Sequence, residues 1–206
     1  MTDTDSRVPG TAGYARSSNV LVDQYESIAF DDLYRPLIDL LPQQGRVLDI
    51  GAGTGRDAAA LAARGLQVRA VEPTLELRSH GQRLHPHPNI VWTDDSLPEL
   101  THVHATGERF QLLLMTAVWM HLDEAERGQA LPRVAGLLAP GGRLFMTIRK
   151  GPVPPGRRMF EVPIDPLVAD AKGNGLALLR RYEFADMLGR DDVSWTMLAF
   201  ERANRV

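Results

Sequence analysis

The 206-residue sequence contains no cysteine, which excludes disulfide bonds, a thiolate nucleophile and cysteine-ligated metals. It has no excess of positive charge either, because 23 Lys and Arg residues face 26 Asp and Glu residues. We therefore do not expect a surface that binds nucleic acid or an anionic membrane. No apolar run approaches the roughly 20 residues of a membrane helix, and residues 1–13 lack the apolar core of a signal peptide. We expect a soluble cytoplasmic protein.

A metal site made by histidine is also not expected. His85 and His87 lie close together, but a proline follows each of them in a segment that reads as a loop. No acid or third histidine stands beside them at the spacing of a ligand set. We interpret this pair as part of a solvated loop and predict no bound metal.

The sequence does contain a regular alternation of short apolar runs and helical segments. The apolar runs fall at residues 47–50, 67–71, 90–93, 110–115 and 143–148. This alternation predicts right-handed crossovers and a doubly wound α/β sheet. Two further runs, residues 176–184 and 193–201, are so close in sequence that we expect them to pair antiparallel.

We expect a single domain over residues 19–206, preceded by a flexible tail at residues 1–18. Residues 19–42 predict two helices before the first strand, of which the first forms a lid over the ligand pocket. Residues 149–165 are rich in glycine and proline at their start, and we interpret them as a loop on the substrate side.

The most informative stretch is VLDIGAGTG at residues 47–55. A strand ends at Ile50, three glycines follow at alternate positions, and an alanine-rich helix begins near Asp57. Glycine allows backbone angles that other residues avoid, and it lets a ligand approach the main chain without meeting a Cβ atom. The start of the helix presents unpaired N–H groups at the same place. Asp49 is interpreted as a support that holds backbone N–H groups of this turn.

Acidic side chains end the next two strands. Glu72 ends the second strand, where a carboxylate can accept both hydroxyls of a ribose. Asp94 and Asp95 end the third strand, where a carboxylate can accept a hydrogen bond from an exocyclic amine. Doubly wound sheets bind ligands beyond the carboxyl ends of their strands, where the strand order reverses. Together these residues predict a nucleoside site.

Dinucleotide cofactors compete with this interpretation, because Glu72 also lies about 20 residues after the glycines, as their fingerprint requires. The third glycine, Gly55, comes one residue too early for the GxGxxG pattern. This mismatch disfavours a nicotinamide-dependent oxidoreductase, which stays as an alternative.

Five motifs in this order make the sequence resemble class I S-adenosylmethionine-dependent methyltransferases. The motifs are residues 47–55, Glu72, residues 94–98, residues 110–121 and LAPGGRL at residues 138–144. The resemblance covers about residues 37–202 and implies a seven-stranded, mostly parallel sheet with an antiparallel last strand and helices on both faces. It also implies S-adenosyl-L-methionine as the cofactor and S-adenosyl-L-homocysteine as its product.

The resemblance further implies which residues contact the cofactor. The methionine part and the transferred methyl would be contacted by Gly51, Ala52, Gly53, Ala117 and Val118. The ribose would be bound by Glu72. The adenine would be contacted by Pro73, Leu77, Asp95 or Asp94, Ser96 and Leu97.

Catalysis and acceptor binding leave alternatives open. His121 is either a general base, for which its ordinary pKa is suitable, or part of the cofactor wall. Methyl transfer from a sulfonium needs mainly an aligned nucleophile at close range, so it can also proceed without a base.

Two groups of side chains are candidates for contact with the acceptor. The side chains of Arg149, Arg157 and Arg158 either grip a carboxylate or phosphate of the acceptor or belong to a solvated basic loop. Tyr14, Tyr25 and Trp119 either line the acceptor pocket or fill the gap beneath the N-terminal helices.

We therefore predict an enzyme that transfers a methyl group to an N, O or S atom of a small molecule, with an anionic acceptor if the basic loop contacts it. A nucleic-acid acceptor is disfavoured by the acidic charge. It is disfavoured also because residues 115–118 read MTAV, where an Asn/Asp-Pro-Pro-aromatic run would serve the exocyclic amines of bases. Other methylation of RNA stays open. A cofactor-binding partner protein without activity is the second alternative.

Overall fold

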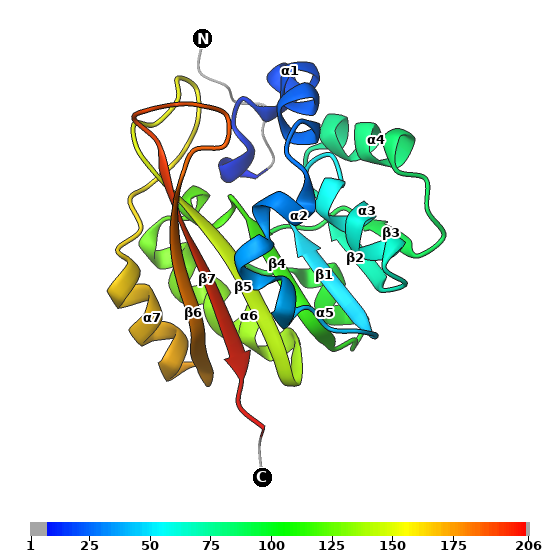
Figure 1. Ribbon diagram of the computed structural model, residues 1–206, viewed down its shortest axis with the longest axis vertical. Coiled ribbons are helices and arrows are strands. Elements are labelled where there is room, and N and C mark those ends of the chain that lie inside the picture. Colours follow the sequence, from blue (N-terminus) through cyan, green and yellow to red (C-terminus); the bar gives the residue numbers. More distant parts are fainter. Residues whose placement is uncertain (1–7, 205–206) are drawn as a thin grey trace.

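A computed structural model describes residues 8–204, and its centre is one seven-stranded sheet in the order β3-β2-β1-β4-β5-β7-β6 (Figure 1). The strands are β1 (Arg46–Ile50), β2 (Gln67–Val71), β3 (Ile90–Thr93), β4 (Phe110–Thr116), β5 (Leu138–Lys150), β6 (Leu176–Ala185) and β7 (Ser194–Arg202). Six strands are parallel, and β7 runs antiparallel to both of its neighbours. This arrangement confirms the predicted fold class.

The strand order places the predicted ligand site. β2 and β4 lie on either side of β1, so the chain winds in opposite directions from the middle of the sheet. A cleft opens at such a reversal because the two crossover connections leave on opposite faces. The glycine turn after β1 lies at this point.

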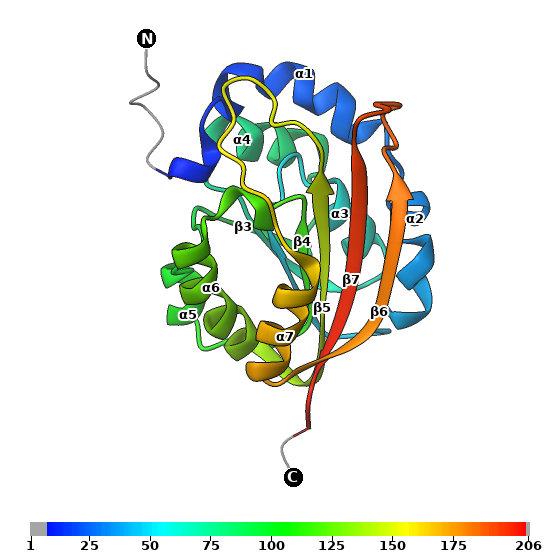
Figure 2. The ribbon, with the colours of Figure 1, turned by 90° about the vertical axis from the view of Figure 1, so that its left-hand side faces the viewer.

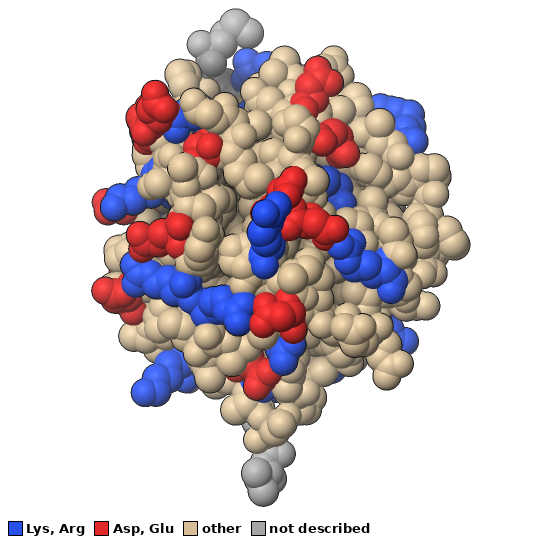
Figure 3. All heavy atoms as spheres, viewed as in Figure 1, with Lys and Arg blue, Asp and Glu red and all other residues tan. Residues whose placement is uncertain are grey.

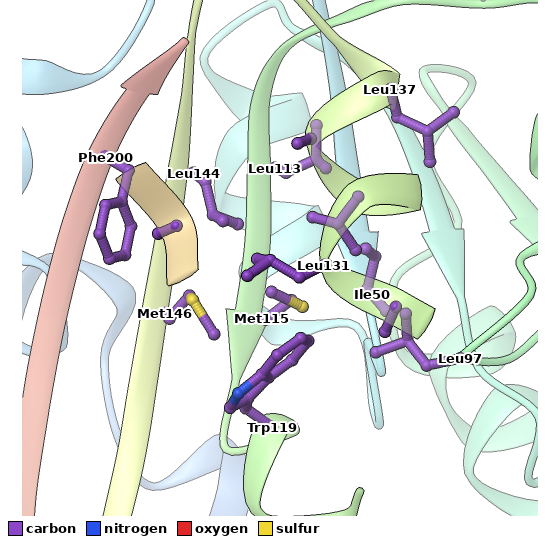
Figure 4. Packing of buried hydrophobic residues seen from close by; sticks show 14 of the residues in the cluster. Ile50, Leu97, Leu113, Met115, Trp119, Leu131, Leu137, Leu144, Met146 and Phe200 are labelled. Carbon is purple, nitrogen blue, oxygen red and sulfur yellow. The ribbon is translucent and has the colours of Figure 1, made fainter. Parts of the chain in front are cut away.

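Helices cover both faces of the sheet, as Figure 2 shows with the sheet seen nearly edge-on. One face carries α5 (Thr101–Ala105), α6 (Glu124–Leu137) and α7 (Ile164–Gly173), and the other carries α2 (Phe30–Leu33), η2 (Arg35–Leu40) and α3 (Arg56–Ala63). Between α6 and the sheet, Leu131 packs with Leu113, Leu144 and Met146 (Figure 4). Burial of these apolar side chains is what fixes the strand ends relative to one another.

Two helices lie beyond the carboxyl ends of the strands. α1 (Tyr14–Glu26) and α4 (Leu75–Leu84) pack against each other at the top of the molecule in Figure 1. A short 3-10 turn, η1 (Pro9–Thr11), precedes α1, and another, η3 (Trp119–His121), follows β4. The predicted lid over the pocket is therefore present, and it is α1.

The predicted flexible tail at residues 1–18 is wrong over the part that the structure describes. Gly13, with φ of 77°, begins α1, and Tyr14 is already helical. Only Ser18 and Leu21 of this helix are buried. Its sequence therefore has only a weak apolar face, which gives little indication of a helix. Long-range contacts of Tyr14, described below, hold its start in place. Residues 1–7 of the predicted tail lie outside the described residues.

The second predicted helix of residues 19–42 is not continuous. The chain forms the single turn of α2 and then the 3-10 helix η2, which has Pro36 in its first turn. Proline has no N–H to donate and clashes with the preceding turn of an α-helix, so it separates the two elements. Both still pack on the sheet through Phe30, Leu33 and Leu37.

None of the helices of the described residues is long and apolar enough to cross a bilayer. Figure 3 shows both basic and acidic side chains on one face of the molecule. A protein that follows a phosphate backbone concentrates its Lys and Arg on one surface.

Candidate functional site

A cavity of about 470 Å³ lies at the carboxyl ends of β1, β2 and β4. Its walls come from the glycine turn after β1, the segments after β2, β3 and β4, the 154–159 loop and the loop between β6 and β7, while α1 covers it. This volume is within the range of small-molecule sites.

Most residues predicted from the sequence line this cavity. They are Tyr14, Tyr25, Asp49, Gly51, Ala52, Gly53, Glu72, Pro73, Leu77, Asp95, Ser96, Leu97, Ala117, Val118, His121, Arg149 and Arg157. Three predicted residues, Asp94, Trp119 and Arg158, do not line it.

The glycine turn is tied to the end of β2. The N–H groups of Gly51 and Ala52 both donate to the carbonyl of Val71, at 2.8 and 2.9 Å. Gly51 has φ of 70°, and a Cβ atom added to it would lie 2.5 Å from Cγ2 of Val118. The turn therefore requires glycine both for its backbone angles and for the close approach of the segment after β4.

Glu72 bridges the glycine turn and the start of α4. Its Oε2 accepts a hydrogen bond from the Gly53 N–H at 2.9 Å, and its Oε1 accepts one from the Thr74 N–H at 2.8 Å. Burial raises the pKa of Glu72, and these donors oppose the increase. A carboxylate has about four lone-pair positions, so two remain for the hydroxyls of a ligand.

Asp49 has a different role from the one predicted. The N–H groups of Gly51 and Ala52 donate to Val71 and that of Gly53 donates to Glu72, so none of these three donates to Asp49. Its Oδ2 atom is buried without a hydrogen-bond partner. Burial, followed by repulsion from Asp57, raises the pKa of Asp49 well above its ordinary value. A ligand that donates a hydrogen bond or carries a positive charge would satisfy this oxygen.

Of the two acids after β3, Asp95 belongs to the wall of the cavity. It is 8% exposed, and its carboxylate accepts hydrogen bonds from the N–H groups of Ser96 and Val103, each at 2.9 Å. Asp94 instead forms an ion pair with Arg78 at 3.1 Å, on the outer side of the same segment. Asp95 therefore lines the cavity and Asp94 does not, while the contact of either acid with adenine stays a prediction.

Trp119 is not part of the pocket. It is 1% exposed and packs in the core beside Met115, as Figure 4 shows. The sequence placed Trp119 in the right segment, but the 3-10 turn η3 directs its indole toward α6 and the sheet and leaves His121 on the cavity side.

His121 and Tyr14 of α1 are hydrogen-bonded to each other within the cavity. His121 Nε2 lies 2.9 Å from the Tyr14 hydroxyl, and His121 Nδ1 lies 2.7 Å from the carbonyl oxygen of Arg158. Tyr25 lines the same cavity, and burial raises the pKa of both tyrosine hydroxyls. Burial lowers the pKa of His121, and the charges of Arg157 and Arg158 lower it further. The imidazole is therefore neutral near pH 7.

The basic loop divides into residues that face the cavity and one that does not. The guanidinium of Arg157 stacks on Tyr14, 3.8 Å from the ring centroid, and Arg149 has a buried Nε atom without a hydrogen-bond partner. Arg158 was predicted to contact the acceptor, but it pairs with Asp123 and Glu126 at 2.9 and 2.7 Å. These two acids cap α6, so Arg158 fastens the loop to that helix.

The loop between β6 and β7 is the part of the site that sequence reasoning missed. Asp186 of this loop lines the cavity together with Arg190 and Trp195. Asp186 Oδ1 accepts hydrogen bonds from Arg190 at 2.6 Å and from Trp195 Nε1 at 2.9 Å, and these donors hold the pKa of Asp186 far below its ordinary value. The predicted antiparallel strand could have indicated this loop. A strand antiparallel to β5 begins at the edge of the sheet where β5 ends, so the loop before β7 lies at the ligand site.

The described residues also contain no group of three or more His, Asp or Glu side chains that could hold a metal ion.

Comparisons with known proteins agree with this arrangement. The sequence family described as "Methyltransferase domain" matches residues 47–142. The uncharacterized methyltransferase Rv3342 of Mycobacterium tuberculosis is 35% identical over 113 residues, which are 51% of this chain and 40% of that protein. The chain thus spans less than half of the length of this relative.

Solved structures share the fold. The 1,6-didemethyltoxoflavin-N1-methyltransferase of Burkholderia thailandensis, which was crystallised with 1,6-didemethyltoxoflavin and S-adenosylhomocysteine, has a TM-score of 0.72 and 21% identity. The alignment covers 93% of this chain and 86% of that one. The [4+2]-cyclase SpnF has a TM-score of 0.71 and 13% identity, with 93% and 94% covered. The fold is therefore shared by proteins whose named reactions differ.

Proposed function

We propose that this chain, whose residues 47–142 match a methyltransferase domain, transfers a methyl group from S-adenosyl-L-methionine to a small molecule. The observation that carries the proposal is the single cavity formed by the glycine turn, Glu72 and Asp95 at three adjacent strand ends. The same cavity continues to His121 and Arg149, so a cofactor and an acceptor can occupy it together.

The residues present suit this cofactor. The two free lone-pair positions of Glu72 would accept the ribose hydroxyls, while Leu77 and Leu97 offer apolar surface and Asp95 an acceptor for the adenine. Oδ2 of Asp49, buried and without a partner, would receive the ammonium group of the methionine part beside Gly51. Ala117 and Val118 would close the opposite side of that part.

The bound cofactor supplies an electrophilic methyl group on a positively charged sulfur. The contribution of the protein is to hold an N, O or S atom of the acceptor in line with that methyl group and to keep water away. The cover formed by α1 and the 154–159 loop serves both purposes. It also limits the acceptor to a small molecule, because a polymer would require an open groove.

The charge around the acceptor end favours an anionic group on that molecule. Arg149, Arg157 and Arg190 line the cavity there, while Asp186 is the acid on the same side and is already occupied by Arg190. The buried Nε of Arg149 has no partner among the described residues, and a carboxylate or phosphate oxygen would supply one.

Calorimetry with the full chain tests the cofactor assignment. We expect S-adenosylhomocysteine to bind wild-type protein, NAD not to bind, and Glu72→Gln to weaken binding at least tenfold because one carboxylate oxygen becomes a donor. Glu76→Gln, on the same connection but outside the cavity lining, is the matched control. Equal affinity in wild type and Glu72→Gln would contradict the ribose assignment, and tight binding of NAD would favour an oxidoreductase.

A methyl-donor assay tests the activity. Protein and S-adenosylmethionine with a labelled methyl group are incubated with fractionated cell extract, and mass analysis identifies any small molecule that gains the label. A noncatalytic cofactor-binding protein would bind S-adenosylhomocysteine but label nothing across a broad acceptor panel.

A further inference from the structure

The hydrogen bonds around His121 fix which of its nitrogens carries the proton. A carbonyl oxygen can only accept a hydrogen bond, so the 2.7 Å contact with the Arg158 carbonyl requires a proton on Nδ1. In the neutral imidazole Nε2 then has a lone pair, and the Tyr14 hydroxyl at 2.9 Å donates to it. Both nitrogens are therefore occupied by groups of the protein.

A second tyrosine lies in the same space. Tyr25 lines the cavity with Tyr14, and burial raises the pKa of both hydroxyls, so both carry their protons near pH 7. Donation runs from the Tyr14 hydroxyl to His121. The oxygens of both tyrosines keep lone pairs that can accept from a ligand.

The ring of Tyr25 lies at the glycine turn. A Cβ atom added to Gly53 would lie 3.4 Å from this ring, so the ring faces the backbone that we assign to the methionine part. Tyr14, Tyr25 and His121 all line the same cavity. Because Tyr14 already occupies Nε2 of His121 and Arg158 occupies Nδ1, a proton from a ligand reaches His121 through the Tyr14 hydroxyl.

We propose that Tyr14 and His121 form a proton relay, in which the acceptor gives its proton to the Tyr14 oxygen and the Tyr14 proton passes to His121, which does not touch the acceptor. This inference rests on the proposed methyl transfer. It replaces the direct general base predicted from the sequence with a tyrosine that contacts the reacting atom and a histidine that acts through it.

In this step the acceptor atom forms a bond to the methyl carbon while the carbon–sulfur bond breaks, and the electron pair of that bond neutralises the sulfonium. The proton of the acceptor moves to the Tyr14 oxygen, while the Tyr14 proton moves to Nε2 of His121. The products are the methylated acceptor, a neutral thioether and an imidazolium whose Nδ1–H stays on the Arg158 carbonyl.

His121 is neutral before the reaction and becomes an imidazolium only during methyl transfer. Burial and the two neighbouring guanidinium groups keep His121 unprotonated before the reaction, so its lone pair is available. Loss of the sulfonium charge during transfer offsets the charge that His121 gains. The relay therefore suits acceptors that lose a proton on methylation, such as hydroxyls, thiols and N–H groups.

Two binding probes test the relay without knowledge of the acceptor. S-adenosylhomocysteine carries no group at the position of the methyl, whereas sinefungin carries an amine on carbon there and can donate to a tyrosine oxygen. We expect Tyr14→Phe to lower the affinity for sinefungin relative to S-adenosylhomocysteine by roughly tenfold, the effect of one hydrogen bond to a charged group. Tyr182→Phe, which removes an exposed hydroxyl on β6, should leave the ratio unchanged.

Nitrogen NMR of the histidine rings in the S-adenosylhomocysteine complex gives a second measurement. Tyr14→Phe removes the donor that stabilises the neutral form at Nε2, so the pKa of His121 should rise. An unchanged affinity ratio or an unchanged His121 pKa overturns the relay while the proposed function stands. Failure of wild-type protein to bind S-adenosylhomocysteine overturns the proposed function itself, and the relay with it.

Discussion

Glu26, the last residue of α1, accepts a hydrogen bond at 2.5 Å from the hydroxyl of Thr54 in the glycine turn. The same carboxylate lies 3.2 Å from Nε2 of His85, at the end of α4. Because α1 buries only Ser18 and Leu21, contacts at its two ends contribute much of what holds it over the cavity.

We therefore expect Glu26→Ala to release the cover. The dissociation rate of S-adenosylhomocysteine should increase roughly three- to tenfold. The loss of a fully buried hydrogen bond to a charged group would have a larger effect, but Glu26 is partly exposed. Stopped-flow displacement measures this rate. Asp23→Ala, an exposed position on the same helix, is the control, and equal rates in the two variants would contradict the role of Glu26.

Gly51→Ala should abolish the cofactor site. Gly107→Ala is the control that shows the effect of backbone strain alone. The two glycines have φ of 70° and 68°, so alanine costs about 1–2 kcal/mol of backbone strain at either position. Only at Gly51 does the added Cβ meet an atom within 4 Å, namely Cγ2 of Val118.

Calorimetry should thus show unchanged affinity for S-adenosylhomocysteine in Gly107→Ala and a loss of at least tenfold in Gly51→Ala. If both variants bind as wild type does, the turn is not the place where the cofactor meets the main chain.

Arg157 and Arg158 are neighbours with opposite expected effects. Arg158→Ala should lower the free energy of unfolding by roughly 1–2 kcal/mol, because it removes two partly buried ion pairs to the cap of α6. Arg157→Ala should change the unfolding free energy less and raise the KM of an anionic acceptor. Thermal denaturation and steady-state kinetics on both variants give the comparison, and a KM effect confined to Arg158→Ala would reverse the two roles.

His121 should make stability depend on pH. Its folded-state pKa is below the ordinary 6.5, so below pH 6.5 the unfolded chain binds a proton that the folded chain does not. The contribution of His121 is fully present above pH 6.5 and is lost as the pH falls toward the folded pKa.

Denaturation of wild type and His121→Gln between pH 5 and 8 checks the sign. The slope of unfolding free energy against pH should be smaller in the variant below pH 6.5 and equal above it. His104, whose pKa is also lowered by burial, adds a slope of the same sign in both proteins, so only the difference between them is informative.

The cofactor half of the site was predictable from sequence because parallel strands bring their carboxyl ends to one edge. Once the strands ending at Ile50, Val71 and Thr93 were located, the neighbourhood of Gly53, Glu72 and Asp95 followed from topology alone. Local spacing carries this information, since each of these residues lies within three positions of the end of a strand.

The acceptor half was less predictable because side-chain direction and distant contacts decide it. Trp119 and His121 are two residues apart, yet one enters the core and the other lines the cavity. Arg157 and Arg158 are adjacent and also point to different partners. The contact between Tyr14 and His121 joins residues 107 positions apart, which no local pattern indicates.

The position of β7 has a consequence for biosynthesis. β7 is made after every other strand, yet it lies between β5 and β6 and carries Trp195 into the wall of the cavity. Another part of the wall comes from α1, the first α-helix of the described chain to be synthesised. A nascent chain that has not released residue 202 from the ribosome therefore has a glycine turn but no enclosed site, and cofactor capture must follow the completion of the sheet.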